Sequence, residues 1–179
     1  MSANIIHLLE KRKASIIKQW FGLVIDTYPP ETANFLKKEK DPFHNPVGKT
    51  TIKCLEVLLD HLLDKIDELS LISYIDPIIR IRSVQDFPPS KAIGFIFFLK
   101  KIIRSELKNA KNISFETREL SSLENRIDDL ALIAFDVYVK CRETFYQIKA
   151  NEEKNRFYKA FERAGLVKEI TEERQDVSS

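Results

Sequence analysis

The stretch DPFHNPVGKT, residues 41–50, gathers residue types that can bind a metal or a phosphate group. His44 carries a metal-ligating imidazole, and the stretch ends in Gly-Lys-Thr as a phosphate loop does. A phosphate loop also needs an earlier glycine in the GxxxxGK[ST] pattern and a preceding strand, and neither is present here. Asn45 followed by Pro46 is instead typical of a helix start with an asparagine N-cap. The sequence therefore predicts a turn that leads into a helix.

The remaining residues capable of chemistry are isolated from one another. His7, His44 and His61 fall on different segments without HxxxH or HxxE spacing, which predicts no metal site. Cys54 and Cys141 form no CxxC pair, a pattern that fits a reducing compartment rather than a disulfide scaffold. No GxSxG elbow or other nucleophile beside a base is legible. We therefore expect that the protein is not an enzyme and that it binds no cofactor and no metal ion.

Asp136 is the acidic residue with the most apolar neighbours, since it stands within the run 131–138, ALIAFDVY. A carboxylate buried there would be destabilising unless it were paired. We expect a buried ion pair with Arg80 or Arg82, of which only one can reach it because they face different sides of a helix. The alternative is that Asp136 senses a ligand.

Composition indicates a soluble globular protein. The 179 residues are 44% apolar and 31% charged, with 29 basic and 27 acidic residues interspersed along the chain. This balance does not favour nucleic acid as a partner. The apolar run at residues 92–99 is too short to cross a bilayer, and no export signal is visible. We expect a cytoplasmic protein with one domain, residues 1–167, and a flexible tail, residues 168–179.

Glycines and prolines divide the chain into segments whose apolar residues recur at three- and four-residue spacing. The expected helices span residues 2–27, 31–38, 47–67, 70–84, 89–107 and 114–165. Within residues 70–84, Pro77 is expected to begin a new helix with Asp76 as its N-cap. No segment shows the alternating pattern of a strand. The predicted fold class is therefore all-α, a single helical bundle.

The last segment, residues 114–165, contains no proline and no glycine before Gly165, which suits a C-cap. Its first part has a heptad-like apolar seam from Leu120 to Cys141, which predicts burial. Its distal part keeps only three aromatic anchors on a polar helix, namely Phe157, Tyr158 and Phe161. We expect the distal part to project and to cover these aromatics with the same helix of a second subunit, giving a homodimer.

Four stretches together resemble the RsbRD N-terminal domain family. They are DPFHNPVG at 41–48, IRIRSVQDFPPSKAIGFIFFLKKIIR at 79–104, LALIAFDVYVKCRE at 130–143 and NEEKNRFYKAFERA at 151–164. The resemblance covers roughly residues 10–165. It implies a bacterial sensory domain of a stressosome RsbT co-antagonist, globin-like without haem, dimeric, with a long C-terminal helix that carries the signal onward. The end of the chain leaves no room for the phosphorylatable STAS domain of that family, so we expect signalling through non-covalent contacts.

These observations lead to one expected function and one alternative. The expected function is a non-catalytic regulatory domain that dimerises and contacts an unknown protein partner through its C-terminal helix. The alternative is a small-molecule sensor with a globin-like internal cavity. The cavity would be lined by Phe95, Phe98 and Phe135, with Asp136 or an arginine as its polar anchor.

Overall fold

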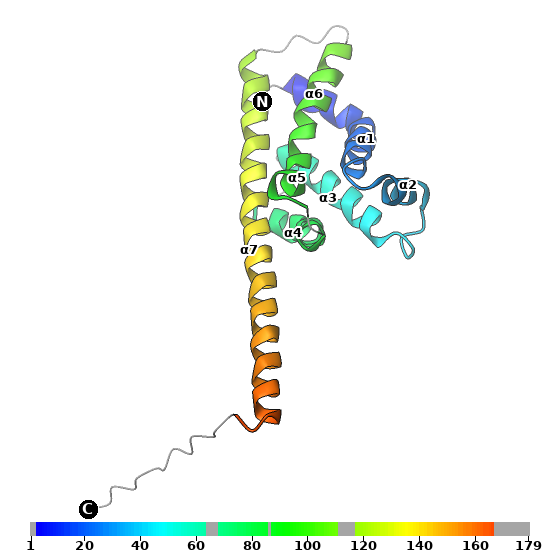
Figure 1. Ribbon diagram of the computed structural model, residues 1–179. Helices are drawn as coiled ribbons and strands as arrows, with labels where there is room; N and C mark the ends of the chain where they lie inside the picture. The colour runs from blue at the N-terminus through cyan, green and yellow to red at the C-terminus, as the bar shows by residue number, and fades with distance from the viewer. Residues whose placement is uncertain (1–2, 64–67, 86, 111–116, 167–179) are drawn as a thin grey trace, which may run out of the picture. The chain divides into compact units, whose positions relative to one another are not determined.

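The computed structural model describes residues 3–63, 68–85, 87–110 and 117–166, and all regular elements among them are helical (Figure 1). The elements are α1 (Ala3–Ile25), α2 (Pro30–Lys38), α3 (Pro46–Leu62), α4 (Glu68–Val84), α5 (Pro89–Gly94), the 3-10 helix η1 (Phe95–Phe97), α6 (Phe98–Asn109) and α7 (Thr117–Arg163). The predicted all-α fold class is confirmed. The chain forms two compact units, which divide between Arg142 and Glu143, so each unit contains part of α7.

Asn45 organises the turn between α2 and α3. Its Oδ1 accepts the backbone N–H of Gly48 at 2.8 Å, and Pro46 occupies the first helical position, so the predicted N-cap is confirmed. Its Nδ2 donates to the carbonyl groups of Leu36 at 3.0 Å and Glu39 at 2.9 Å. One buried amide therefore ties the end of α2 to the start of α3.

The predicted helix start at Pro77 is wrong, because α4 runs through this proline. Proline removes one hydrogen bond from the helical ladder, since it has no N–H. Buried residues lie on both sides of it, with Leu71 and Ile75 before it and Ile78 and Ile79 after it. Burial of these side chains favours one continuous helix over a break. Asp76 does not cap a helix but pairs with Arg80 one turn later.

The predicted helix over residues 89–107 is interrupted by η1. The carbonyl group of Phe95, the first residue of η1, accepts a hydrogen bond from the indole Nε1 of Trp20 at 2.7 Å. Both side chains are fully buried, so α1 is fixed to this point of the chain. The tighter winding at η1 therefore coincides with a tertiary contact to a backbone carbonyl.

The core of the first unit lies where α1 packs against α3 and α6, and where α3 packs against α4. The part of α7 at residues 117–142 adds its buried side chains to the same core. These are Leu123, Ile127, Leu130, Ala131, Ala134 and Tyr138. A smaller apolar cluster joins the end of α1 to α2 and contains Ile25, Tyr28, Ala33 and Leu36.

The second unit contains the part of α7 that begins at Glu143. All of residues 146–166 are exposed. Helix α7 ends at Arg163 and is followed by Gly165, whose φ of 68° is the left-handed conformation that glycine adopts readily. Gly165 N–H donates to the carbonyl of Glu162 at 3.0 Å, and Leu166 N–H donates to that of Phe161 at 2.9 Å. This Schellman motif confirms the predicted C-cap. The expected tail, residues 168–179, lies outside the described residues.

Candidate functional site

Three aromatic side chains of the second unit are exposed, as the sequence predicted for its distal helix. Phe157 is 64% exposed, Tyr158 55% and Phe161 50%. At 100° per residue, Phe161 lies about 40° from Phe157 around the helix, whereas Tyr158 lies about 100° away. Phe157 and Phe161 therefore form one face, and Tyr158 stands at its side.

Sequence reasoning missed another member of this face. Tyr146 is 54% exposed and precedes Phe157 by eleven residues, which places the two within about 20° of each other on a straight helix. Ala150 precedes Phe161 by the same interval. The eleven-residue spacing was the signal that could have revealed Tyr146. We call Tyr146, Phe157 and Phe161 the aromatic face.

A hollow of about 370 Å³ lies beside Phe157. It is lined by Glu153, Arg156, Phe157 and Ala160. These residues stand at positions i, i+3, i+4 and i+7, the spacing of the four residues that receive one side chain of a neighbouring helix. The arrangement suits contact with a second helix.

The four residues predicted to line an internal cavity occupy different environments. Phe95 is fully buried and Phe98 is half-buried against the core, whereas Phe135 is 41% exposed. The burial predicted for Asp136 is wrong, since this residue is exposed. Asp136 lies about 200° around α7 from the buried Ala134, which turns it away from the core. The structure does not bring these four residues together around one interior space.

The expected ion pair of Asp136 with Arg80 or Arg82 is also wrong. Arg80 is bound by Asp76, with nitrogen to oxygen distances of 3.1 to 3.2 Å. Arg82 is fully buried, unlike Asp136. Apolar neighbours along the sequence suggested burial of Asp136, but they surround α7 on all sides and include exposed residues such as Leu132.

Arg82 is the unexpected charged residue of the core. Its guanidinium carbon lies 4.3 Å from the ring centre of Phe87, 5.3 Å from that of Tyr28 and 5.4 Å from that of Phe95. These distances are typical of cation–π contacts, which are stronger when water is excluded. The aromatic rings therefore provide part of the stabilisation that a buried cation requires.

Hydrogen bonds satisfy only part of the Arg82 guanidinium. Nε donates to the carbonyl of Ala92 at 3.1 Å, and Nη2 donates to Thr27 Oγ1 and to the carbonyl of Lys91, each at 2.9 Å. Among the described residues, Nη1 has no hydrogen-bond partner, and neither has the buried hydroxyl of Tyr28. Burial lowers the pKa of Arg82, and the neighbouring Tyr28 opposes this effect. Arg82 Nη1 and the Tyr28 hydroxyl oxygen are thus the buried polar atoms of this region that lack a hydrogen bond within the described residues.

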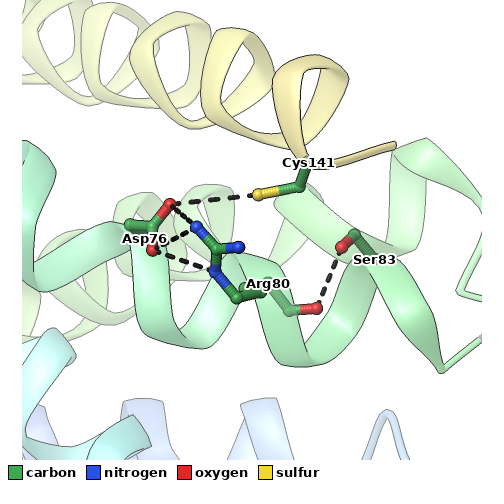
Figure 2. Close-up of polar contacts among 4 residues, drawn as sticks. All are labelled: Asp76, Arg80, Ser83 and Cys141. Carbon is green, nitrogen blue, oxygen red and sulfur yellow. Dashed lines mark hydrogen bonds and ion pairs between the residues drawn. The ribbon is translucent and has the colours of Figure 1, made fainter. Parts of the chain in front are cut away.

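Asp76 connects α4 to the last buried turn of α7 (Figure 2). The Cys141 thiol points at Asp76 Oδ1 across 3.9 Å, a weak contact. Burial raises the pKa of Cys141, and the Asp76 carboxylate raises it further. Because the thiolate is the nucleophilic form, this cysteine is suited to packing rather than to catalysis.

Further polar contacts hold residues 117–142 of α7 to other helices of the first unit. Two ion pairs reach α6, and two hydrogen bonds reach backbone carbonyl groups at and beyond the end of α4. They are Lys100–Asp128 at 2.7 Å, Arg104–Glu124 at 2.8 Å, Tyr138 to Phe87 at 3.2 Å and Arg142 to Ser83 at 2.8 Å. This stretch of α7 is therefore an integral part of the first unit.

The described residues contain neither a metal-binding cluster nor a candidate membrane span. No group of three or more His, Cys, Asp and Glu side chains could hold a metal ion there. Within the same residues, no helix combines the length and apolar character needed to cross a membrane.

Comparison with known proteins defines the class to which this helical chain belongs. The family model of the RsbT co-antagonist protein rsbRD N-terminal domain matches residues 14–152. The chain therefore belongs to the RsbRD N-terminal domain family, whose members are sensory domains of stressosome co-antagonists. The resemblance noted in the sequence is confirmed. No curated protein and no solved structure matches the chain significantly.

Proposed function

We propose that this chain is a non-catalytic regulatory domain that forms a homodimer and contacts a partner protein through α7. Membership of a family of sensory domains supports the regulatory class. The observation that carries the proposal is the exposed aromatic face, because large aromatic rings grouped on one side of a polar helix mark interaction surfaces. In this proposal the functional domain spans residues 1–167, and Tyr158 contacts the edge of the interface.

Burial of the aromatic face would stabilise a helix pair. Removing one phenylalanine side chain from water contributes about 1.5 to 3 kcal/mol. The hollow beside Phe157 has the spacing that receives one side chain of a facing helix. Charges of both signs flank the face, so two copies of the helix can approach without net repulsion. They are Glu153, Lys154 and Arg156, each within about 100° of Phe157 around the helix.

The contacts of residues 117–142 suggest how a signal would enter this helix. Ion pairs and hydrogen bonds join that stretch to α6 and to the end of α4. A rearrangement of the first unit would shift these contacts, and α7 is continuous from Thr117 to Arg163. The proposed role of α7 is therefore to carry a change from the first unit to the partner.

The test compares two faces of the same helix. Ile148 is 53% exposed and lies about 180° from Phe157, since nine residues make two and a half turns. We expect the wild-type protein and the control I148A to form dimers, and the double variant F157A/F161A to dissociate at least about tenfold more readily. Sedimentation velocity and native mass spectrometry measure this difference. Equal dimer stability in all three proteins would refute the dimer interface.

The partner contact needs a separate experiment. A photo-crosslinking residue at position 157, introduced into cells that produce the protein, should form covalent adducts with a different protein as well as with a second copy. The same photo-crosslinking residue placed at position 148 should form few adducts. Adducts only with a second copy would support the homodimer and contradict the partner contact.

A second candidate function is a small-molecule sensor. It is favoured by two buried atoms that have no hydrogen-bond partner among the described residues, Arg82 Nη1 and the Tyr28 hydroxyl oxygen. A ligand with a hydrogen-bond acceptor could complete the coordination of Nη1. Native mass spectrometry of the protein from its own host should then show extra mass that denaturation releases. The variant R82M should lose this mass, whereas R80M, at an exposed arginine, should keep it. Wild-type protein at the mass of the polypeptide alone would contradict this candidate.

A further inference from the structure

The surface formed by α1, α2 and α3 contains two adjoining grooves of about 630 Å³ and 490 Å³. The first lies between α1 and α3, and the second between α2 and α3, with Phe21, Ile52 and Glu56 lining both. Because these three residues are shared, the grooves form one continuous depression, which we call the α1–α3 trough. Every lining residue belongs to the first unit, so the trough is separate from the aromatic face.

The floor of the trough is apolar. Ala14, Ile17 and Phe21 lie three or four residues apart on α1, and Ile52 faces them from α3. Ile52 is 37% exposed and Phe21 is half-buried, so both present apolar surface to solvent. A depression with an apolar floor on the surface of a protein marks a site for another molecule more often than an isolated exposed residue does.

The rim of the trough is basic. Seven lysines and three glutamates line the two grooves, although the whole chain has a net charge of only +2. Lys13 is paired with Asp60 at 2.7 Å, and Lys37 is paired with Asp26. The side chains of the other five have no acidic partner among the described residues, namely Lys11, Lys18, Lys40, Lys49 and Lys53, and Lys53 lies over the ring of Tyr74. Positive charge is therefore concentrated around an apolar floor.

We propose that the α1–α3 trough binds an acidic amphipathic helix of a protein partner. The apolar side of such a helix would lie on Phe21 and Ile52, and its flanking carboxylates would meet the unpaired lysines. Helices bind grooves in this way through apolar anchors at three- and four-residue spacing. The lysine rim specifies the sign of the flanking charges, since complementary charge selects the partner and accelerates its association.

The other classes of occupant fit less well. Single-stranded nucleic acid binds through exposed aromatic stacking platforms, whereas this floor is mainly aliphatic apart from Phe21. A membrane surface requires apolar groups that protrude, whereas these line a depression. The helix of a second copy has mixed charge on the distal part of α7, so it lacks the excess of carboxylates that the rim would select.

The test places a photo-crosslinking residue at position 52 of the full chain in its own host. We expect adducts whose partner peptide is rich in Asp and Glu and has apolar residues at three- and four-residue spacing. The triple variant K11E/K18E/K49E should lose these adducts. The control K91E/K101E/K108E reverses three exposed lysines outside the trough and should keep them. Circular dichroism verifies that both variants remain helical.

The crosslinked segment, made as a synthetic peptide, then provides the affinity measurement. In fluorescence anisotropy, the peptide should bind the purified K11E/K18E/K49E protein about tenfold to a hundredfold more weakly than wild type. The reason is that electrostatic attraction becomes repulsion at three positions. The control variant should bind within about twofold of wild type. Added salt should weaken binding to wild type, since exposed charges are screened.

Several outcomes would overturn the proposal. Adducts at position 52 with a second copy, with the chain itself or with lipid would assign the trough another occupant. Three other results would also refute the proposed acidic helix. They are a crosslinked peptide without an excess of acidic residues, an equal adduct yield in the two triple variants, and the absence of any adduct. None of these results bears on the aromatic face, because position 52 and the substituted lysines all lie in the first unit.

Discussion

The two parts of α7 have the same secondary structure but different surroundings. The stretch from Thr117 to Arg142 contains seven buried residues between Leu123 and Cys141, mostly three or four positions apart, and its polar contacts reach neighbouring helices. From Glu143 to Arg163, the described residues contain no buried side chain. The second stretch keeps a helical sequence, without proline or glycine, and a glycine cap at its end.

The difference shows that helix formation and burial can be specified separately. In the first stretch, packing of apolar side chains stabilises the helix. In the second stretch, where no side chain is buried, stability depends on intrinsic helix propensity and on the C-cap. Variants that affect one stretch and spare the other will therefore test the comparison.

The largest effect is expected from truncating a buried side chain of the first stretch. Ile127 is fully buried, so I127A should lower the free energy of unfolding by about 2 to 4 kcal/mol through lost burial and a cavity. The matched variant F161A in the second stretch should change the free energy of unfolding of the monomer by less than about 0.5 kcal/mol. Urea unfolding at low protein concentration measures both. Equal losses in the two variants would contradict the comparison.

A smaller effect is expected at the helix end. Gly165 has a φ of 68°, so G165A should weaken the C-cap by about 1 kcal/mol because alanine is strained in this conformation. The amide protons of residues 158–163 should exchange faster with solvent. Gly22 is the control, since an added Cβ meets open space within α1 and alanine favours a helix. G22A should therefore stabilise the protein, and unchanged exchange in G165A would show that the cap is dispensable.

Acid should affect the first stretch through the Arg104–Glu124 pair. The hydrogen bond from Arg104 holds the pKa of Glu124 below its ordinary value of 4.5. A carboxylate with a lowered folded-state pKa stabilises the fold above its unfolded-state pKa, and this contribution disappears as pH falls through the folded-state pKa. E124Q should therefore be less stable than wild type at pH 7, by less than about 1 kcal/mol because water screens the pair, and this difference should shrink as the pH falls below 4.5.

The control for this acid effect is E152Q in the second stretch, where Glu152 forms no ion pair with another described residue. Its unfolding free energy should follow that of wild type at both pH values. Urea titrations at about pH 7 and pH 3 provide the comparison. A constant difference between E124Q and wild type across this range would exclude the ion pair as its source.

The smallest effect is expected where the buried stretch ends. The Asp76 carboxylate contributes to the raised pKa of Cys141, so D76N should increase the thiolate fraction and accelerate labelling by a disulfide reagent a few-fold. Burial, the larger cause, should keep the rate well below that of unfolded protein. The C54A background isolates Cys141. An unchanged or slower rate would mean that Asp76 does not influence the thiol.

Local sequence signals predicted most of the helices. Proline and glycine mark segment ends, and capping chemistry is contained within a few residues, so the roles of Asn45 and Gly165 could be read directly. The continuation of α4 through Pro77 could not be predicted from local signals, because it depends on the packing of residues on both sides of the proline. The 3-10 turn at Phe95 likewise coincides with a hydrogen bond from Trp20, which is distant in sequence.

The candidate sites were predicted less completely. The exposed Phe157 and Phe161 followed from a polar helix with few apolar residues, but the alignment of Tyr146 required counting over three turns. Arg82 was expected at most to neutralise an acid, whereas aromatic rings from three different parts of the chain surround it. Such a site forms only when distant parts of the chain come together in the fold, so no local sequence pattern predicts it.

The hydrogen bonds of Asn45 have a consequence for the evolution of this chain. A Cβ atom at position 48 would lie 2.4 Å from Asn45 Nδ2, so any other residue there would displace the Asn45 amide from its present position. The position of the Asn45 side chain therefore depends on Gly48, whereas a glycine at position 48 does not require asparagine at position 45. Relatives that keep Asn45 should accordingly keep glycine at position 48, and relatives that lack Asn45 should tolerate other residues there.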